Sequence, residues 1–241
     1  DNPWFPEVLN QERLKAKRQM TQEDYEHIWE GKARSVAAGA IYRHEITALI
    51  AEERIRPVPY DPLLPVHTVW DLGWNDAMTI GFVQIGPQDV RIIDYIEDSH
   101  RTLDWYVGQI EKRNYRWGTD YLPHDGRTRN YQTGKSTEEL LRIMGRRPFV
   151  LPSTSVEEGI KAARMAFPRM YFDKIKTSRL VECLKRYKRR LHEKTGEPMA
   201  PLHDEHSHGA DMFRYIAQAI PVMSSSANDD YEEPPEPDWR V

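Results

Sequence analysis

The chain has 241 residues, of which 39% are hydrophobic and 30% are charged, and its formal net charge at pH 7 is −4. These values indicate one sizeable domain with polar extensions. No apolar run approaches the roughly 18 residues that cross a bilayer, so we expect no membrane partner. The single cysteine, Cys183, excludes an internal disulfide and fits a reducing compartment. The start, Asp1-Asn2-Pro3-Trp4, does not look like a secretory signal, and because it lacks Met we expect a fragment of a longer protein.

Residues 1–62 show helical patterns and no strand pattern, and we expect a helical linker or arm. Thr21 is a candidate cap for a short helix over residues 24–29. A longer amphipathic helix is predicted over residues 33–54. The proline-rich stretch 56–62 stops any helix and is typical of a stiff connector. We therefore place a domain boundary at residue 62.

From residue 63 the pattern changes to strands. Short apolar runs predict five of them, over residues 66–72, 77–85, 90–97, 119–124 and 147–151. Helices are predicted over residues 103–117, after the capping boxes that begin at Ser136 and Ser155, over the basic segment 177–195, and over residues 207–220, where Pro221 ends the last helix. This order predicts an α/β domain over residues 63–222, with a mixed five-stranded sheet flanked by helices.

The last segment, residues 223–241, is rich in serine and then in acidic residues and proline. Such a composition cannot bury enough apolar surface to fold alone, so we predict an acidic disordered tail.

Three aspartates stand where a carboxylate needs a partner. Asp71 and Asp125 each follow an apolar run that predicts a buried strand, and Asp211 lies in the first turn of the last apolar helix. A charge in such surroundings is costly unless it is paired or bound to a cation. Brought together, the three would form an oxygen-rich site for Mg²⁺ or Mn²⁺. Each also has a plainer interpretation, as a turn residue for the first two and as a helix-start acid for Asp211.

Several neighbours could complete such a site. Asp76 is a candidate fourth carboxylate. His124 and His208 are candidates to orient a ligand or move a proton. The histidine-rich stretch 203–208 looks like a zinc cluster, but structural zinc usually needs four spaced ligands, and no cysteine is near. Gly134-Lys135-Ser136 lacks the upstream glycine of a P-loop, since Arg129 stands there, so we expect no ATP hydrolysis in this fragment.

The segment from residue 160 to residue 194 holds twelve basic and three acidic residues, in a chain that is acidic as a whole. Charge runs are often solvated helix faces, but this excess favours a track for double-stranded DNA, bound through its phosphates. The candidate DNA-binding residues are Arg164, Arg169, Lys185, Arg186, Lys188, Arg189 and Arg190.

Taken together, residues 71–76, 122–126, 167–173, 201–204 and 207–215 resemble, in order, the motifs of a known family. This is the C-terminal nuclease domain of the large terminase subunit of tailed bacteriophages. The resemblance covers about residues 63–221 and implies an RNase H-like fold that cuts concatemeric viral DNA during genome packaging. It also implies that two divalent ions, Mg²⁺ or Mn²⁺, are held by Asp71, Asp125 and Asp211.

The resemblance further implies partners and a place. Residues 1–62 resemble the linker that follows an ATPase motor domain of the same polypeptide. The expected partners are double-stranded DNA, the small terminase subunit and the portal of the procapsid, in the host cell cytoplasm. Two alternatives stay open. One is another RNase H-like enzyme, such as a junction resolvase or a transposase, and the other is a non-catalytic docking module of a viral packaging motor.

Overall fold

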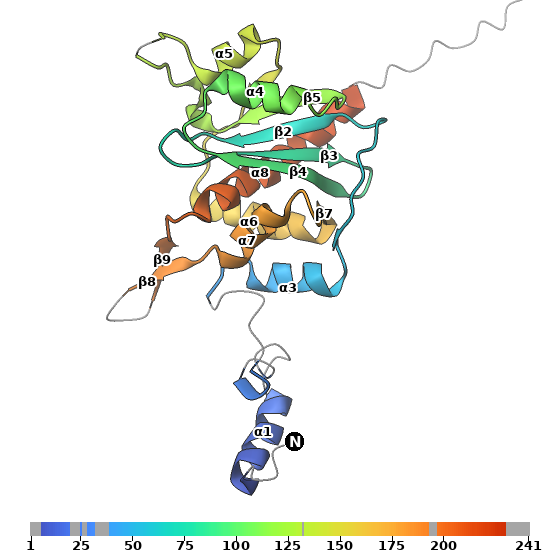
Figure 1. The fold of residues 1–241 in the computed structure, drawn as a ribbon, viewed down its shortest axis with the longest axis vertical. Helices are drawn as coiled ribbons and strands as arrows, with labels where there is room; N and C mark the ends of the chain where they lie inside the picture. The colour runs from blue at the N-terminus through green and yellow to red at the C-terminus, as the bar shows by residue number, and fades with distance from the viewer. Residues whose placement is uncertain are drawn as a thin grey trace, which may run out of the picture.

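The computed structural model describes residues 6–19, 25, 28–31, 39–131, 133–192 and 197–229. Within them, seven strands form one sheet in the order β1-β7-β4-β3-β2-β5-β6 (Figure 1). Their bounds are β1 (Ile55–Arg56), β2 (Val66–Asp71), β3 (Met78–Ile85), β4 (Val90–Asp98), β5 (Trp117–Leu122), β6 (Pro148–Val150) and β7 (Met170–Asp173). β3 is antiparallel to β2 and β4, and the other pairs are parallel. The mixed α/β sheet is confirmed, and the strand number of five was too low.

The two strands that the sequence pattern missed are short. β7 begins two residues after Pro168 and pairs with β4, and β1 has two residues within the stretch that we predicted to be helix and connector. Neither run is long enough to show a strand period. β7 pairs with the edge that β4 presents, and β1 then pairs with β7.

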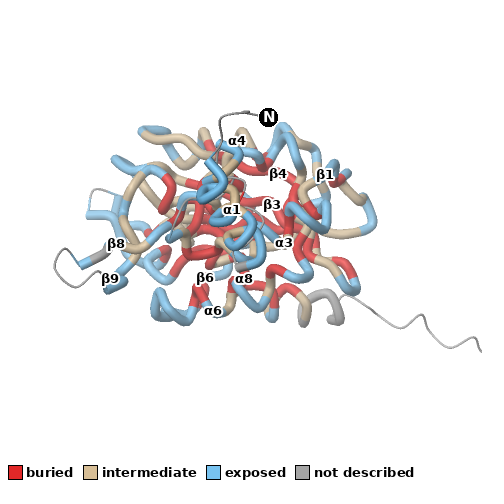
Figure 2. The backbone as a smooth tube through the Cα atoms, turned by 90° about the horizontal axis from the view of Figure 1, so that it is seen from below, coloured by how far each residue is buried: buried red, intermediate tan, exposed pale blue. Residues whose placement is uncertain are grey.

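Alternate residues of the strands face two separate cores, as the pleat of a strand requires. Val69, Ile92 and Tyr121 point to the core under α3 (Arg43–Ala51), α6 (Val156–Ala166), α7 (Ser178–Arg186) and α8 (Ser207–Asp229). Their neighbours Trp70, Ile93 and Leu122 point to the core under α4 (Leu103–Glu111) and α5 (Thr137–Ile143). Figure 2 shows this burial as red strands and inner helices with pale blue outer turns.

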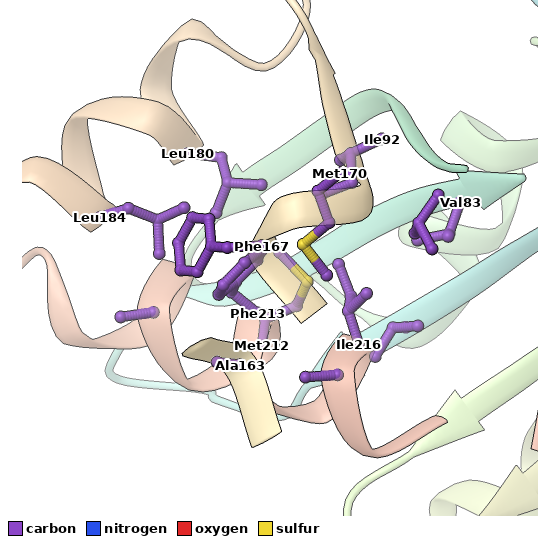
Figure 3. Packing of buried hydrophobic residues seen from close by; sticks show 14 of the residues in the cluster. Val83, Ile92, Ala163, Phe167, Met170, Leu180, Leu184, Met212, Phe213 and Ile216 are labelled. Atoms are coloured by element: carbon purple, nitrogen blue, oxygen red, sulfur yellow. The ribbon is translucent and has the colours of Figure 1, made fainter. Parts of the chain in front are cut away.

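α8 lies against β2 and β3, with Met212, Phe213 and Ile216 buried in the larger core (Figure 3). Gly81 of β3 permits this close approach, because a Cβ there would lie 2.6 Å from the Met212 sulfur and 3.0 Å from Ile216 Cδ1. The start of α8 lies at the ends of these two strands, because the Thr79 hydroxyl, opposite Asp71, donates to the His208 carbonyl at 3.2 Å.

Two predicted helix ends were wrong. α8 does not stop at Pro221 but continues through it to Asp229. Pro221 removes one helical hydrogen bond, and burial of the next turn offsets that loss, because Met223 is fully buried and Val222 packs against the core. The first residues of the predicted tail are thus helical, and residues 230–241, with most of its acidic and proline residues, lie outside the described residues.

The predicted basic helix over residues 177–195 was also wrong. α7 ends at Arg186, and Tyr187 takes an extended conformation. The Tyr187 side chain is buried and stacks on Tyr42 at a centroid distance of 5.9 Å, and its carbonyl accepts a 2.7 Å hydrogen bond from the Ile41 backbone. Beyond it, β8 (Arg189–Leu191) pairs with β9 (Pro198–Pro201) as a separate hairpin. Contacts distant in sequence therefore override local helix preference.

At the N-terminus, α1 (Glu7–Gln19) lies apart from the sheet (Figure 1). The helix predicted over residues 33–54 is confirmed only as the shorter α3. Of the helix predicted over residues 24–29, the structure describes residues 25, 28 and 29, which are helical, and the rest lies outside the described residues. Ile46 and Leu49 of α3 are fully buried, and β1 joins the sheet, so residues 43–56 share the core of the domain. The division of the whole chain into arm, domain and tail stays a prediction. In the described part of the chain, no helix has the length and apolarity to span a bilayer.

Candidate metal centre

Asp71 ends β2, and Asp211 stands in the second turn of α8, which crosses that strand. Burial raises the pKa of the Asp71 carboxyl to about 6, and the negative charge of Asp211 adds to the rise. His208 opposes it, with its Nδ1 3.7 Å from Asp71 Oδ2. The buried end of β2 therefore holds a carboxylate close to a second one, without a full complement of positive partners.

The Asp211 carboxylate is held from two sides. Arg214, one turn further along α8 and itself buried, donates to Asp211 Oδ1 from Nη2 at 2.7 Å and from Nε at 3.2 Å. The Tyr187 hydroxyl donates to the same oxygen at 3.3 Å. None of these three hydrogen bonds uses Oδ2. The contacts thus fix the orientation of the carboxylate through one oxygen only.

Asp125 lies in the 3-10 turn His124–Arg127 that follows β5. β5 is parallel to β2, so both strands end at the same edge of the sheet, where α/β folds usually place ligand sites. The pKa of Tyr215, one turn beyond Asp211, is raised to about 12, first by burial and then by the charges of Asp71, Asp211 and Asp125. The charges of all three aspartates thus contribute to raising the pKa of the Tyr215 hydroxyl. The convergence of the three aspartates on one metal site stays a prediction, as do their roles.

Asp76, His203 and His208 form a second group beside Asp71. Each offers one ligand atom, and these atoms lie within 4.8 Å of one another. His203 Nε2 is 3.7 Å from Asp76 Oδ2, and its Nδ1 lies 3.2 Å from Ser207 Oγ, which fixes the ring. The stretch 203–208 thus contributes two imidazoles to a group with Asp76, rather than four zinc ligands of its own. His124 is exposed, at the start of the turn that holds Asp125.

The predicted DNA-binding residues do not share one helix. Arg164 reaches the Ile41 carbonyl at 2.7 Å, and Arg169 reaches that of Gln88 at 3.2 Å. Lys185 and Arg186 pair with Glu182 within α7. Three residues follow in or next to the β8–β9 hairpin: Lys188 and Arg190 are exposed, whereas Arg189 makes two 2.6 Å hydrogen bonds to Glu157.

The hairpin starts at the candidate centre. Tyr187, whose hydroxyl contacts Asp211, directly precedes Lys188. Lys188 and Arg190, which are both exposed, therefore follow within three residues of Tyr187, whose hydroxyl contacts Asp211. Sequence reasoning found the basic residues but missed this arrangement, and it also missed the contact of Tyr187 with Asp211. No local signal foretells a contact between residues 24 positions apart.

No protein-family model and no curated protein matches this chain. Solved structures do resemble it. The large terminase of a thermophilic bacteriophage aligns over 92% of this chain and 54% of its own, with a TM-score of 0.60 and 17% identity. The P22 large terminase nuclease domain aligns over 70% and 89%, with a TM-score of 0.52 and 18% identity. The nuclease domain of the bacteriophage SPP1 large terminase, with bound Mn, aligns over 66% and 86%, with a TM-score of 0.50 and 16% identity.

The chain therefore has the fold of large terminase nuclease domains, which is RNase H-like, and the fold expected from the resemblance is confirmed. The chain spans about half the length of the large terminase from the thermophilic bacteriophage.

Proposed function

We propose that this chain is a divalent-metal-dependent endonuclease that cuts concatemeric viral double-stranded DNA during genome packaging. The observation that carries the proposal is the position of Asp71, a partly buried carboxylate at the end of β2 whose pKa is raised to about 6 by burial and by the charge of another candidate ligand, Asp211. A structural carboxylate normally has its pKa lowered by its partners. One that is raised by burial and by a second acid fits a cation site.

The residues present fit Mg²⁺ or Mn²⁺. Asp71, Asp125 and Asp211 would hold two such ions, with Asp76 as a further ligand. Bound ions of this kind activate a water for in-line attack at phosphorus and stabilise the leaving 3′ oxygen. Arg214 and Tyr187 keep Asp211 oriented through Oδ1, and His208 is placed to orient Asp71. His124, exposed beside Asp125, is a candidate to move a proton at the rim.

We further propose that the remaining half of the polypeptide carries an ATPase motor domain, for which residues 1–62 are the linker. The partners would be the small terminase subunit and the portal of the procapsid, in the host cell cytoplasm. The length of the large terminase from the thermophilic bacteriophage, of which this chain matches about half, supports such an additional domain.

Cleavage of supercoiled plasmid by the whole chain tests the proposal. We expect nicked and linear products with Mn²⁺ or Mg²⁺, and none once EDTA removes the ions. Absence of cleavage with every divalent ion would leave the docking module as the better account. A strong preference for four-way junctions over duplex would favour a resolvase, and joined strands would favour a transposase.

The exposed cations of the hairpin should bind the phosphate backbone. Replacing Lys188 and Arg190 together with Ala should weaken duplex binding and lower the slope of log K against log salt by about one for each phosphate that the variant no longer binds. Fluorescence anisotropy at several salt concentrations measures this slope, on an Asp125→Asn background that prevents cutting. Lys112→Ala, at the end of α4 over the opposite core, is the matched control. An unchanged slope would remove the hairpin from the DNA surface.

A further inference from the structure

A hollow of about 740 Å³ lies between segments that follow two of the candidate metal ligands in the sequence. It is lined by Trp74, Thr128, Arg129, Asn130, Tyr131 and Thr137. Its volume is within the range of about 300–1,000 Å³ that is usual for ligand sites in proteins. No role proposed above for the chain uses these side chains.

The two walls of the hollow continue the segments that carry two of the aspartates. Trp74 is three residues beyond Asp71, and Thr128 is three residues beyond Asp125. The Thr128 backbone donates a 2.7 Å hydrogen bond to the Asp125 carbonyl, which ties this wall to the 3-10 turn. A ligand in the hollow would therefore contact the segments that also carry Asp71 and Asp125.

The segments that form the hollow have defined backbones. The Asn130 backbone donates to the Lys135 carbonyl at 3.0 Å, and a β-bridge joins Arg129 to Ser136. On the other wall, the His100 backbone donates to the Trp74 carbonyl at 3.2 Å, and the two rings meet edge to face at 6.2 Å. Backbone hydrogen bonds and one ring contact thus fix the segments that line the hollow.

Trp74 and Tyr131 are large aromatic residues that the fold leaves in solvent. Trp74 is 57% exposed and Tyr131 is fully exposed, whereas the largest aromatic side chains of the two cores are buried. Exposed rings next to a site are typical of binding surfaces, because a ring gives a large rigid contact area. Flat aromatic faces stack on nucleic-acid bases with little regard to sequence.

Arg129 lines the hollow, and Arg127 precedes it by two residues. The side chains of Arg127 and Arg129 are 68% and 72% exposed, and their ion pairs with Glu138 and Glu139 span 3.5 and 3.2 Å. Such exposed pairs are weak, so the guanidinium groups remain able to bind a phosphate. Aromatic faces with exposed arginines therefore match the two parts of a nucleotide.

We propose that this hollow binds unstacked nucleotides of the DNA strand next to the scissile phosphate, by stacking on Trp74 and Tyr131 and by phosphate contact with Arg129. This proposal rests on the proposed nuclease function. Bases of an intact duplex are stacked on each other and cannot reach such a platform, so the site selects a strand that is locally melted, gapped or frayed. A free nucleoside triphosphate is a poorer candidate, because the segment has no glycine-rich phosphate loop.

The test compares single-stranded with duplex DNA. In the Asp125→Asn chain without added metal, Trp74→Ala should weaken binding of a single-stranded oligonucleotide at least tenfold, with duplex affinity changed less than twofold. Tyr131→Ala should act in the same direction, and Trp74→Phe should restore most of the affinity. Phe149→Ala, a partly exposed aromatic residue on β6, is the matched control and should leave single-strand affinity unchanged.

Equal losses on single strand and duplex would overturn the proposal, as would no loss on either, or Trp74-dependent binding of free ATP without binding of DNA. Cleavage is scored separately, with Asp125 restored. If the chain cuts plasmid but Trp74→Ala leaves single-strand affinity intact, the hollow fails and the nuclease stands. If Trp74→Ala abolishes single-strand binding in a chain that never cuts, the hollow stands as a binding site and the nuclease fails.

Discussion

Replacing Asp71 with Asn should abolish DNA cleavage and at the same time make the metal-free protein more stable. Loss of a metal ligand removes several kcal/mol of transition-state stabilisation, so the cleavage rate should fall on the order of a thousandfold or more. A variant that merely unfolded would lose both activity and stability. A loss of cleavage together with a gain in stability therefore distinguishes a catalytic role of Asp71 from a structural one.

The sign of the stability change follows from the pKa of Asp71. Its pKa is about 6 in the folded chain, above its ordinary value of 3.8. Protonation of this carboxyl therefore favours the folded state, and that contribution is full below pH 3.8 and is lost as the pH rises through about 6. At pH 7.5 the folded chain carries the unfavourable charge, and the neutral Asp71→Asn variant should gain about 2–3 kcal/mol in the free energy of unfolding, at about 1.4 kcal/mol for each pKa unit.

Urea unfolding in EDTA at pH 4 and pH 7.5 measures this gain, which should appear only at the higher pH. Asp89→Asn is the matched control, because Asp89 lies in the β3–β4 turn at the other end of the sheet, paired with Arg91. It should affect neither cleavage nor its pH dependence. Retained cleavage by the Asp71→Asn variant, or a loss of stability at pH 7.5, would contradict the assignment.

Replacing Arg146 with Met should cost about 3–5 kcal/mol of the free energy of unfolding, because it leaves the Asp120 carboxylate buried and unpaired. Asp120 is fully buried on β5, where Arg146 Nε donates to its Oδ2 at 3.1 Å and the Arg147 backbone donates at 3.2 Å. The Thr68 hydroxyl also donates to Asp120, and Trp70 Nε1 donates to that hydroxyl at 2.7 Å. This network joins β5 to β2, the two strands that lead to Asp125 and Asp71.

Urea unfolding measures the loss, with Arg142→Met as the control. Arg142 is exposed on α5 and pairs with Glu138 at 2.9 Å, so its replacement should cost less than about 1 kcal/mol. A double variant, Asp120→Leu with Arg146→Met, should recover part of the stability, since no charge is then left unpaired. Equal losses of unfolding free energy for Arg146→Met and Arg142→Met would show that the buried pair of Arg146 and Asp120 does not stabilise the contact between β5 and β2.

Local patterns predicted the elements whose signals are local. The three long strands of the β2–β3–β4 meander alternate or run apolar over six to nine residues, and each was found within two residues. Both predicted capping boxes are present, since Ser136 and Ser155 each accept from the backbone of the glutamate three residues on. These features depend on neighbours in the sequence, which a single sequence displays.

The errors come from contacts that are distant in the sequence. Tyr187 ends α7 because Tyr42 and Ile41 hold it, 145 and 146 residues away. Pro221 fails to end α8 because the core takes up Met223. β1 and β7 exist only as partners of a sheet that other segments build. In each case the sequence shows the local preference, and tertiary packing decides the outcome.

The candidate site divides in the same way. The i,i+3 spacing of Asp211 and Arg214 is readable in the sequence, and the structure shows the ion pair. The approach of His203 to Asp76 joins residues 127 positions apart, and no pattern predicts it. The hollow beside Trp74 could likewise not be predicted from the sequence, because its two walls follow different strands, β2 and β5.

Soaking crystals with Mn²⁺ and locating the ions by anomalous scattering tests the central claim most directly. We predict two anomalous peaks, both coordinated by carboxylate oxygens of Asp71, Asp125 and Asp211, and the loss of at least one peak in Asp125→Asn. Peaks confined to the group of Asp76, His203 and His208, or no peak near Asp71 and Asp125, would contradict a two-ion nuclease centre.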